Sequence, residues 1–267
     1  MISSLSKKVL AQAMLLLTLV IASTKAASPF PSASNPVTRQ ALELRGGGGG
    51  TTTAKALTTL GLVVGTTTSL SAKTVLDKSG FQKSYPVSIL TTRRIGGAIL
   101  SFSLVAYFLL FQQTSASTAV GISVLPTIID LSKTLLDGTH KELGFPAAGQ
   151  VFVLIVSSTF SFLFLNDNSP LLSSSKDTLL LKIYAGWLLT NGVLMGCFPK
   201  LACQAYGELD ASGLPVLQYF VSLWGFSLLS LGTLSGCLGT GMMTTEKVLA
   251  VSALPFCSRF IVSKFLS

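Results

Sequence analysis

Charged residues are scarce in this sequence. Asp, Glu, Lys and Arg make up 11% of its 267 residues, whereas a soluble domain carries about 25%. Hydrophobic residues make up 49%, and the mean hydropathy is +0.66. A chain with so few charged residues has too few of them for the surface of an ordinary water-soluble protein. The composition therefore favours lipid as the solvent for much of the molecule and predicts contact with a bilayer.

Histidine and paired cysteines are scarce too. There are one histidine and four cysteines, and no cysteine belongs to a C-x-x-C pair. The cysteines fall in or beside apolar runs, whereas a secreted disulfide framework places them in soluble loops. His140 has no partner for an H-E-x-x-H or Cys/His zinc motif, and no G-x-S-x-G elbow is present. We therefore expect no metal, no cofactor and no enzymatic activity.

The basic residues do not indicate nucleic-acid binding. The formal charge is +9, and removal of the leader lysines Lys7, Lys8 and Lys25 leaves +6, with the remaining Lys and Arg beside apolar runs. A nucleic-acid-binding protein would need a basic stripe on a soluble surface. The pentaglycine run 46–50 is followed by Thr51 and not by Gly-Lys-Ser/Thr, so it is no phosphate-binding loop.

The first 53 residues predict a leader and a linker. Residues 1–26 have a basic start, an apolar run over 9–22, and small residues Thr24 and Ala26 before a cleavage point, which is typical of a secretory signal peptide. An uncleaved membrane anchor is the alternative. Residues 27–53 are rich in Pro, Ser and Gly and predict a flexible linker. The transmembrane helical domain is then expected over 54–267.

The leader followed by Ala27-Ser28-Pro29-Phe30 resembles preproteins of algae with secondary plastids, such as diatoms. The Leu44-Arg45-Gly46-Gly47 segment is similar to the mature starts of diatom membrane proteins. The resemblance implies import into a secondary plastid. In that family an aromatic residue directly follows the cleavage site, whereas Phe30 stands four residues beyond Ala26. A secretory or endomembrane location is therefore the first expectation, and the plastid is the second.

The longest uncharged stretch runs over 95–129 and holds 35 residues between Arg94 and Asp130. One membrane crossing needs about 20 apolar residues, so this stretch is long enough for two. The polar residues 112–115 interrupt it near the middle. We predict a helical hairpin within a bilayer, with Arg93 and Arg94 at the membrane entry.

Seven apolar segments together predict an all-α, polytopic transmembrane helix bundle with six to seven spans. The first segment is rich in Thr, the third contains Pro126, and the last contains Pro255 and Arg259, so these three are the weakest. With seven crossings after a cleaved leader, ten Lys and Arg fall on the inner side and six on the outer side, as the positive-inside rule requires. The segments are 54–72, 95–111, 118–136, 147–165, 179–198, 217–239 and 248–265.

Identical residues recur at two fixed distances along the sequence, 127 and 129 positions, and these two offsets indicate an internal duplication. The order of the matches is kept, so the first three segments correspond to the last three and the fourth is a linker. This parallel 3+1+3 plan resembles that of sugar-transporting SWEET proteins, a resemblance of plan only. Chance matches in Leu/Gly/Ser-rich sequence are the alternative. An offset of 127 pairs Lys55, Leu62, Gly65, Lys73 and Gly80 with Lys182, Leu189, Gly192, Lys200 and Gly207, and an offset of 129 pairs Gly96, Leu100, Ser101, Ser123, Leu125 and Pro126 with Gly225, Leu229, Ser230, Ser252, Leu254 and Pro255.

Three polar residues are candidates for an intramembrane site: Asp130, Lys133 and Asn191. Asp130 and Lys133 share a helical face with Asp137. Charges at membrane depth often serve proton or ion relays, but a solvated row of ion pairs at the helix end explains this spacing more simply. For His140, between Gly138 and Lys141, we expect a solvated loop position.

Asn191 and Gln150 could hydrogen-bond between helices or contact a solute, and helix association is the commoner role. Tyr184, Trp187, Tyr219 and Trp224 could form a stacking site, although interfacial anchoring and packing are more usual.

The sequence leads to three functional hypotheses. The first is a non-enzymatic structural or interaction component of an endomembrane or plastid membrane, with other membrane proteins as partners. The alternative is a small-solute transporter built from two three-helix repeats. A membrane-embedded enzyme comes third, and it would need His140 or Asp130 to face a cavity.

Overall fold

The computed structural model describes residues 48–78, 86–142, 147–166, 174–205, 215–241 and 243–265, and their secondary structure is entirely helical. The all-α prediction is confirmed for these residues. The predicted signal peptide 1–26 and residues 27–47 of the predicted linker lie outside the described residues. The first helix begins at Gly48, inside the stretch predicted as linker.

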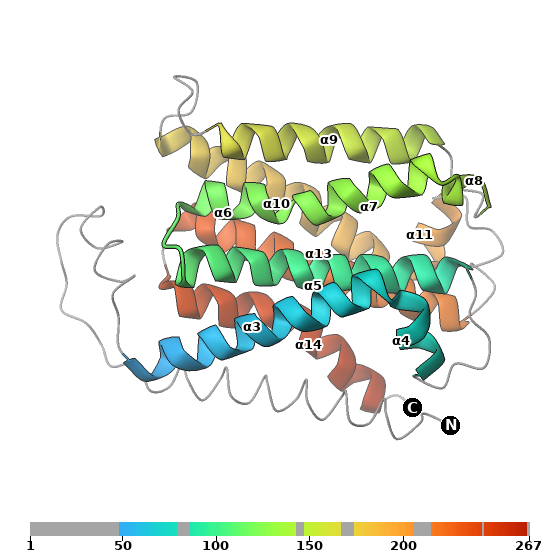
Figure 1. Cartoon of the computed structure of the whole chain (residues 1–267), viewed down its shortest axis with the longest axis horizontal. Coiled ribbons are helices and arrows are strands. Elements are labelled where there is room, and N and C mark those ends of the chain that lie inside the picture. Colours follow the sequence, from blue (N-terminus) through green and yellow to red (C-terminus); the bar gives the residue numbers. More distant parts are fainter. Residues whose placement is uncertain are drawn as a thin grey trace.

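Long helices lie side by side along one axis and alternate in direction (Figure 1). Short helices cluster at one end of this bundle, on the right in the view of Figure 1. The long helices are α3 (Gly48–Leu70), α5 (Pro86–Leu110), α6 (Ala116–Ser123) continued by α7 (Leu125–Leu136), α9 (Ala147–Leu165), α10 (Ser174–Cys197), α13 (Pro215–Thr240) and α14 (Thr245–Phe265), and the short ones are α4 (Ala72–Lys78), α8 (Thr139–Glu142) and α11 (Pro199–Ala205).

Five of these helices are long and apolar enough to cross a membrane. This supports a multi-pass membrane protein, but the predicted count of seven spans is not confirmed. The two predicted spans that do not qualify lie on α3 and α14. Helix α3 carries many threonines, and α14 contains Arg259 as well as the charges of its first turn. The five candidate spans are Val87–Leu110, Ala116–Leu136, Ala147–Leu165, Leu179–Cys197 and Leu217–Thr240.

The predicted hairpin forms, and its polar break is the turn between α5 and α6. Gln113 has a positive φ of 52°, a backbone conformation that non-glycine residues rarely adopt outside turns. Ser115 then caps α6 by accepting a hydrogen bond from the Thr118 N–H at 3.1 Å. Turn and cap together reverse the chain, so that α6 packs back against α5.

The two prolines of the weak segments have different effects. Pro126 lies in the first turn of α7, and the preceding Val124 separates this helix from α6. Pro255 lies inside a continuous α14. There Ser230 Oγ of α13 accepts a hydrogen bond from the backbone N–H of Phe256 at 3.1 Å. Polar side chains of a neighbouring helix commonly satisfy backbone groups beside a membrane proline in this way.

Glycines set the closest helix contacts. A side-chain carbon added to Gly65 of α3 would lie 2.6 Å from the backbone nitrogen of Leu100 in α5. One added to Gly192 of α10 would lie 2.8 Å from the backbone nitrogen of Leu229 in α13. Both contacts need a residue without a Cβ, because small residues let membrane helices approach closely. These four residues are also matched by the 127- and 129-residue offsets of the sequence.

A pair of hydrogen bonds follows the same offsets. Ser69 Oγ donates to the carbonyl oxygen of Arg93 at 3.1 Å between α3 and α5. Ser222 Oγ donates to the carbonyl oxygen of Gly196 at 2.8 Å between α13 and α10. Gly196 stands 127 residues after Ser69, and Ser222 stands 129 residues after Arg93. The pairs α3–α5 and α10–α13 therefore meet at corresponding residues.

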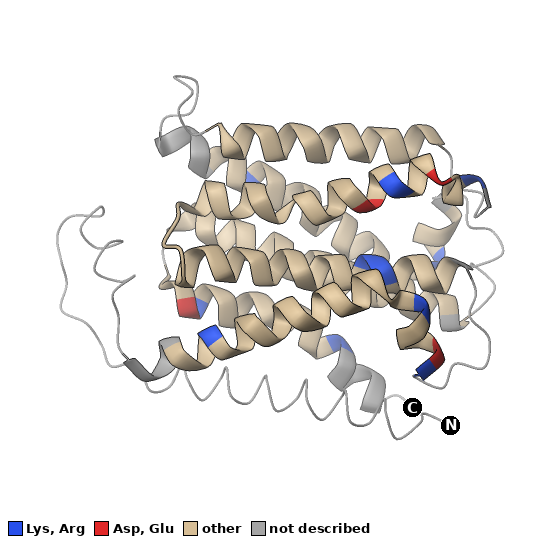
Figure 2. Cartoon of the chain, viewed as in Figure 1, with Lys and Arg blue, Asp and Glu red and all other residues tan. Residues whose placement is uncertain are grey.

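Charge is distributed unevenly along the bundle axis. Figure 2 shows most of the coloured Lys and Arg at the end that carries α4, α8 and α11. The opposite end holds Lys55 on α3, Lys182 on α10 and the Glu246–Lys247 pair at the start of α14. This asymmetry agrees with a membrane orientation in which the richer end faces the inner side.

Candidate functional site: a polar cluster and a cavity between the helices

Arg93 and Arg94, which the sequence predicts at the membrane entry, lie inside helix α5 and not at its first residues. The helix begins at Pro86, so the arginines are about two turns, or about 10 Å, from its start. Proline is well suited to this first position, where a helix has no use for the missing N–H. The side chains of Arg93 and Arg94 are only 17% and 9% exposed.

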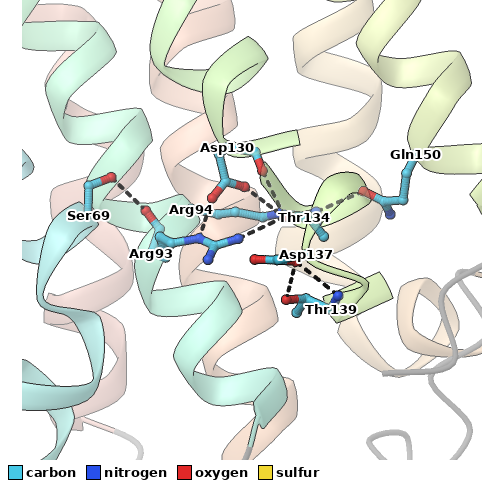
Figure 3. A network of polar contacts seen from close by, with 8 residues as sticks. All are labelled: Ser69, Arg93, Arg94, Asp130, Thr134, Asp137, Thr139 and Gln150. Carbon is cyan, nitrogen blue, oxygen red and sulfur yellow. Dashed lines mark hydrogen bonds and ion pairs between the residues drawn. The ribbon is translucent and has the colours of Figure 1, made fainter. Parts of the chain in front are cut away.

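Asp130 of α7 is the residue that makes this burial possible (Figure 3). Arg93 donates through Nε to a carboxylate oxygen of Asp130, and through Nη2 to the hydroxyl of Thr134 at 2.7 Å. The Thr134 hydroxyl in turn donates to the backbone carbonyl of Asp130 at 2.7 Å. The free-energy cost of removing a guanidinium from water is much smaller when a carboxylate and a hydroxyl are in place to accept its hydrogen bonds.

Arg94 connects the same aspartate to two further helices. Its Nε lies 3.4 Å from the second carboxylate oxygen of Asp130, and its Nη2 donates to Gln150 Oε1 of α9 at 2.9 Å. The guanidinium also lies over the ring of Trp224 in α13, 4.9 Å from its centre, a favourable cation–π arrangement. Side chains from α5, α7, α9 and α13 thus meet at one level of the bundle.

The predicted row of ion pairs along α7 does not form. Asp130 pairs with the arginines of α5, and Lys133 points outward as an exposed side chain. Asp137 is exposed at the C-terminal end of α7 and accepts hydrogen bonds from Thr139 Oγ1 at 2.6 Å and Thr139 N at 3.0 Å. Spacing within one helix could not reveal that the better partners of Asp130 lie on another.

The expected solvated position of His140 is also wrong. The residue is 5% exposed, and its Nδ1 lies 3.1 Å from the carbonyl oxygen of Thr134. Gly138, with a positive φ of 76°, turns the chain so that α8 folds back toward α7 and α9. Glycine adopts this conformation without strain. The turn at Gly138 therefore places His140 in a buried position against the end of α7.

The cavity beyond the cluster has a volume of about 140 Å³. A single buried water needs only about 10–15 Å³ by the same kind of measure, so the space is large enough for a small solute. Its lining on α13 extends from Val221 to Ser235, a rise of about 21 Å along the helix. The cavity therefore follows the long axis of the bundle.

One face of each surrounding helix lines this cavity, with residues recurring every three or four positions. The charged cluster lies at one end, and the chain's two tryptophans are both in the wall. Ser101 is 3% exposed, and its hydroxyl has no hydrogen-bond partner in the structure. The polar and aromatic side chains of the lining are Arg94, Asp130, Gln150, Asn191, Ser101, Ser123, Thr127, Ser157, Ser235, Tyr184, Trp187 and Trp224.

The structure brings two of the three candidate residues to this cavity. Asp130 and Asn191 both line it, and Lys133 does not. Asn191 donates to the carbonyl oxygen of Trp187, one turn earlier on α10, at 2.8 Å. Arg94 and Gln150 complete the polar end of the cavity. The sequence does not reveal the interior position of Arg94, because this arginine stands immediately before the long uncharged stretch. Among the described residues, no three His, Cys, Asp or Glu come together as a metal site.

The chain was compared with protein-family models, curated proteins and solved structures, and none of them matches.

Proposed function

We propose that the protein is a small-solute transporter built from two three-helix halves, with no catalytic activity. The halves are α3, α5 and α6–α7, and α10, α13 and α14, with α9 as the connecting helix. In this proposal α3 and α14 also cross the membrane, which gives seven spans. The corresponding contacts Gly65–Leu100 and Gly192–Leu229 support the duplication.

The observation that carries the proposal is the cavity between the halves. It is lined by α5, α6 and α7 of the first half, by α10 and α13 of the second, by the short helix α11, and by α9. Membrane transporters commonly bind their solute between two repeats that rock against each other. Polar groups within a membrane are costly and are typically retained for a function, and here they gather around one internal space.

Binding can be followed with the protein's own tryptophans, because Trp187 and Trp224 both line the cavity. We expect their fluorescence to change in a saturable way with a solute from a panel of glucose, lactate and choline, which are neutral, anionic and cationic. The same solute should enter proteoliposomes containing the protein. If no member of the panel altered fluorescence or crossed the liposome membrane, the proposal would lose its support.

Asn191→Leu is expected to reduce this flux at least tenfold, because it replaces the amide in the cavity wall. Thr190→Val is the matched control, since Thr190 is exposed on the outer face of the same helix. Equal flux in the two variants would show that the solute does not pass Asn191.

A second candidate is the structural or interaction role that the sequence had favoured. One observation supports it: α9 presents large apolar side chains outward, with Phe152, Ile155 and Phe162 between 56% and 65% exposed. Lipid or a partner helix could cover this face. Purification in mild detergent would then recover a stoichiometric membrane-protein partner, and Phe162→Ala would release it.

The proposed location is the secretory or endomembrane system, with a secondary plastid as the alternative. It rests on the pattern of residues 1–26. A C-terminal fluorescent fusion imaged in the native cell separates the two.

A further inference from the structure

A second pocket opens at the basic end of the bundle, apart from the central cavity. It has a volume of about 290 Å³ and is lined by parts of α10, α11, α13 and α14. Arg259 of α14 is the charged residue in its wall, together with the hydroxyl groups of Ser222 and Ser258. The remaining lining residues are Gly196, Cys197, Pro199 and Phe226.

Arg259 is half-buried and has only neutral contacts. Its Nε donates to Ser222 Oγ at 2.9 Å, and its guanidinium lies 5.1 Å from the ring centre of Tyr219. The two ion pairs of Asp130, with Arg93 and with Arg94, do not involve Arg259, and within the described parts of the chain no carboxylate pairs with it. A partly buried cation without an anionic partner is costly, so the pocket favours a ligand that supplies the missing charge.

In the first half of the chain, the position that corresponds to Arg259 holds a carboxylate, Asp130. The positions that correspond to Ser222 and Arg259, 129 residues earlier, are Arg93 and Asp130. In both halves the two residues contact each other, as an ion pair in the first and as a serine–arginine hydrogen bond in the second. At this point the second half has a cation where the first has a carboxylate, and no carboxylate among the described residues pairs with Arg259.

We infer that the Arg259 pocket binds a phosphate group. A guanidinium offers paired donors that fit two phosphate oxygens, and the hydrogen bond from Arg259 to Ser222 uses only Nε. The pocket lies between helices at the end of the bundle richest in Lys and Arg, where basic pockets meet the head groups of anionic lipids. The phosphate can come from such a head group or from free phosphate in solution.

Cys197 reports on occupancy, because it lines the pocket and is exposed. The purified full-length protein in a non-ionic detergent is treated with a maleimide, with dioctanoyl phosphatidylglycerol, dioctanoyl phosphatidylcholine or inorganic phosphate added. Modification of Cys197 is followed by peptide mass spectrometry. We expect phosphatidylglycerol, phosphate or both to slow it at least fivefold and phosphatidylcholine to have a much weaker effect.

Arg259→Gln should abolish this protection, and Arg259→Lys should retain part of it because the charge remains. Lys200→Gln is the matched control, because Lys200 is exposed on α11 beside the pocket, and it should leave the protection intact. Unfolding temperatures of the three variants show whether each is folded. If Arg259→Gln is unfolded, the comparison between wild type and Arg259→Lys carries the test.

Protection by phosphatidylglycerol alone identifies a lipid head group as the ligand, and protection by inorganic phosphate alone identifies the soluble ion. Protection by both assigns the site to the phosphate group from either source. The inference is overturned if neither ligand slows modification in the wild type, if phosphatidylcholine protects as well as phosphatidylglycerol, or if folded Arg259→Gln is still protected.

Discussion

Individual residues gain their roles here from partners on other helices. Asp130 lies 37 positions after Arg93 and 36 after Arg94, so no local spacing reveals the pairing. On α7 alone, Lys133 is the obvious partner for Asp130 at helical spacing. Asp130 pairs with the buried arginines because a buried charge without a partner has a much larger free-energy cost than an exposed lysine without one.

Asp130→Asn should therefore be strongly destabilising. Removal of one member of a buried ion pair typically costs about 3–5 kcal/mol because the other charge remains buried. Lys133→Gln is the matched control on the same helix, and an exposed side chain of this kind is expected to change stability by less than about 0.5 kcal/mol. Thermal unfolding in detergent measures both. Equal unfolding temperatures for the two variants would contradict the assigned pairing.

Asp137 provides a prediction about pH. Hydrogen bonds from the Thr139 hydroxyl, and then from the Thr139 backbone N–H, lower the pKa of the Asp137 carboxyl below its ordinary value of 3.8. The ionised carboxylate thus contributes stability above the unfolded-state pKa, and this contribution is lost as the pH falls through the lower folded-state pKa. Thr139→Val should move the pKa of Asp137 back up. An NMR titration of the side-chain carboxyl would refute this assignment if the pKa stayed unchanged.

The sequence predicts the positions of the helices well, but it predicts the packing between them less well. The predicted segment 147–165 matches α9 at both ends, because an uncharged and mainly apolar run starts at Ala147 and the polar Asn166 ends it. The segment predicted from residue 95 begins instead at Pro86. Arginines that appeared to mark the end of an apolar helix are in fact part of it, since the carboxylate of Asp130 pairs with both and Thr134 and Gln150 accept further hydrogen bonds from them.

Helix packing leads to a prediction about glycine. An added Cβ on Gly225 of α13 would collide with the backbone of Met195 and Gly196 in α10, and backbone cannot move aside as a flexible side chain can. We expect Gly225→Ala to cost about 1–3 kcal/mol, as overpacking usually does. Gly186→Ala on α10 is the control, because nothing lies within 4 Å of its added carbon.

The control should be neutral or stabilising by up to about 1 kcal/mol, since alanine favours helix over glycine. Unfolding temperatures in detergent test both variants. If Gly225→Ala were as stable as Gly186→Ala, the close approach of α10 and α13 would be wrong.

For the whole molecule, the alternation of the helices has a direct consequence for sidedness. Gln112, in the turn after α5, and Lys141, on α8, are both exposed and lie at opposite ends of the bundle. In a variant without the native cysteines, Gln112→Cys and Lys141→Cys should react with a membrane-impermeant maleimide from opposite sides. Lys200→Cys should react from the same side as Lys141→Cys.

The same labelling tests the crossing of α13. Lys247 follows the end of α13 by seven residues, so Lys247→Cys should react from the side of Gln112→Cys. Labelling of Gln112→Cys and Lys141→Cys from one side would refute the hairpin, whereas labelling of Lys247→Cys from the side of Lys141→Cys would refute the crossing of α13.

The sequence by itself determined that this chain is helical and has spans suited to lipid, because uncharged runs of about 20 residues are stable as helices in hydrocarbon. It also placed the turn at 112–115, where polar residues allow the chain to leave the apolar region. Tertiary structure alone decided which charges meet, that His140 is buried, and that Asp130 and Asn191 share one cavity. Those outcomes depend on contacts between residues far apart in the chain, which helical spacing within one segment does not encode.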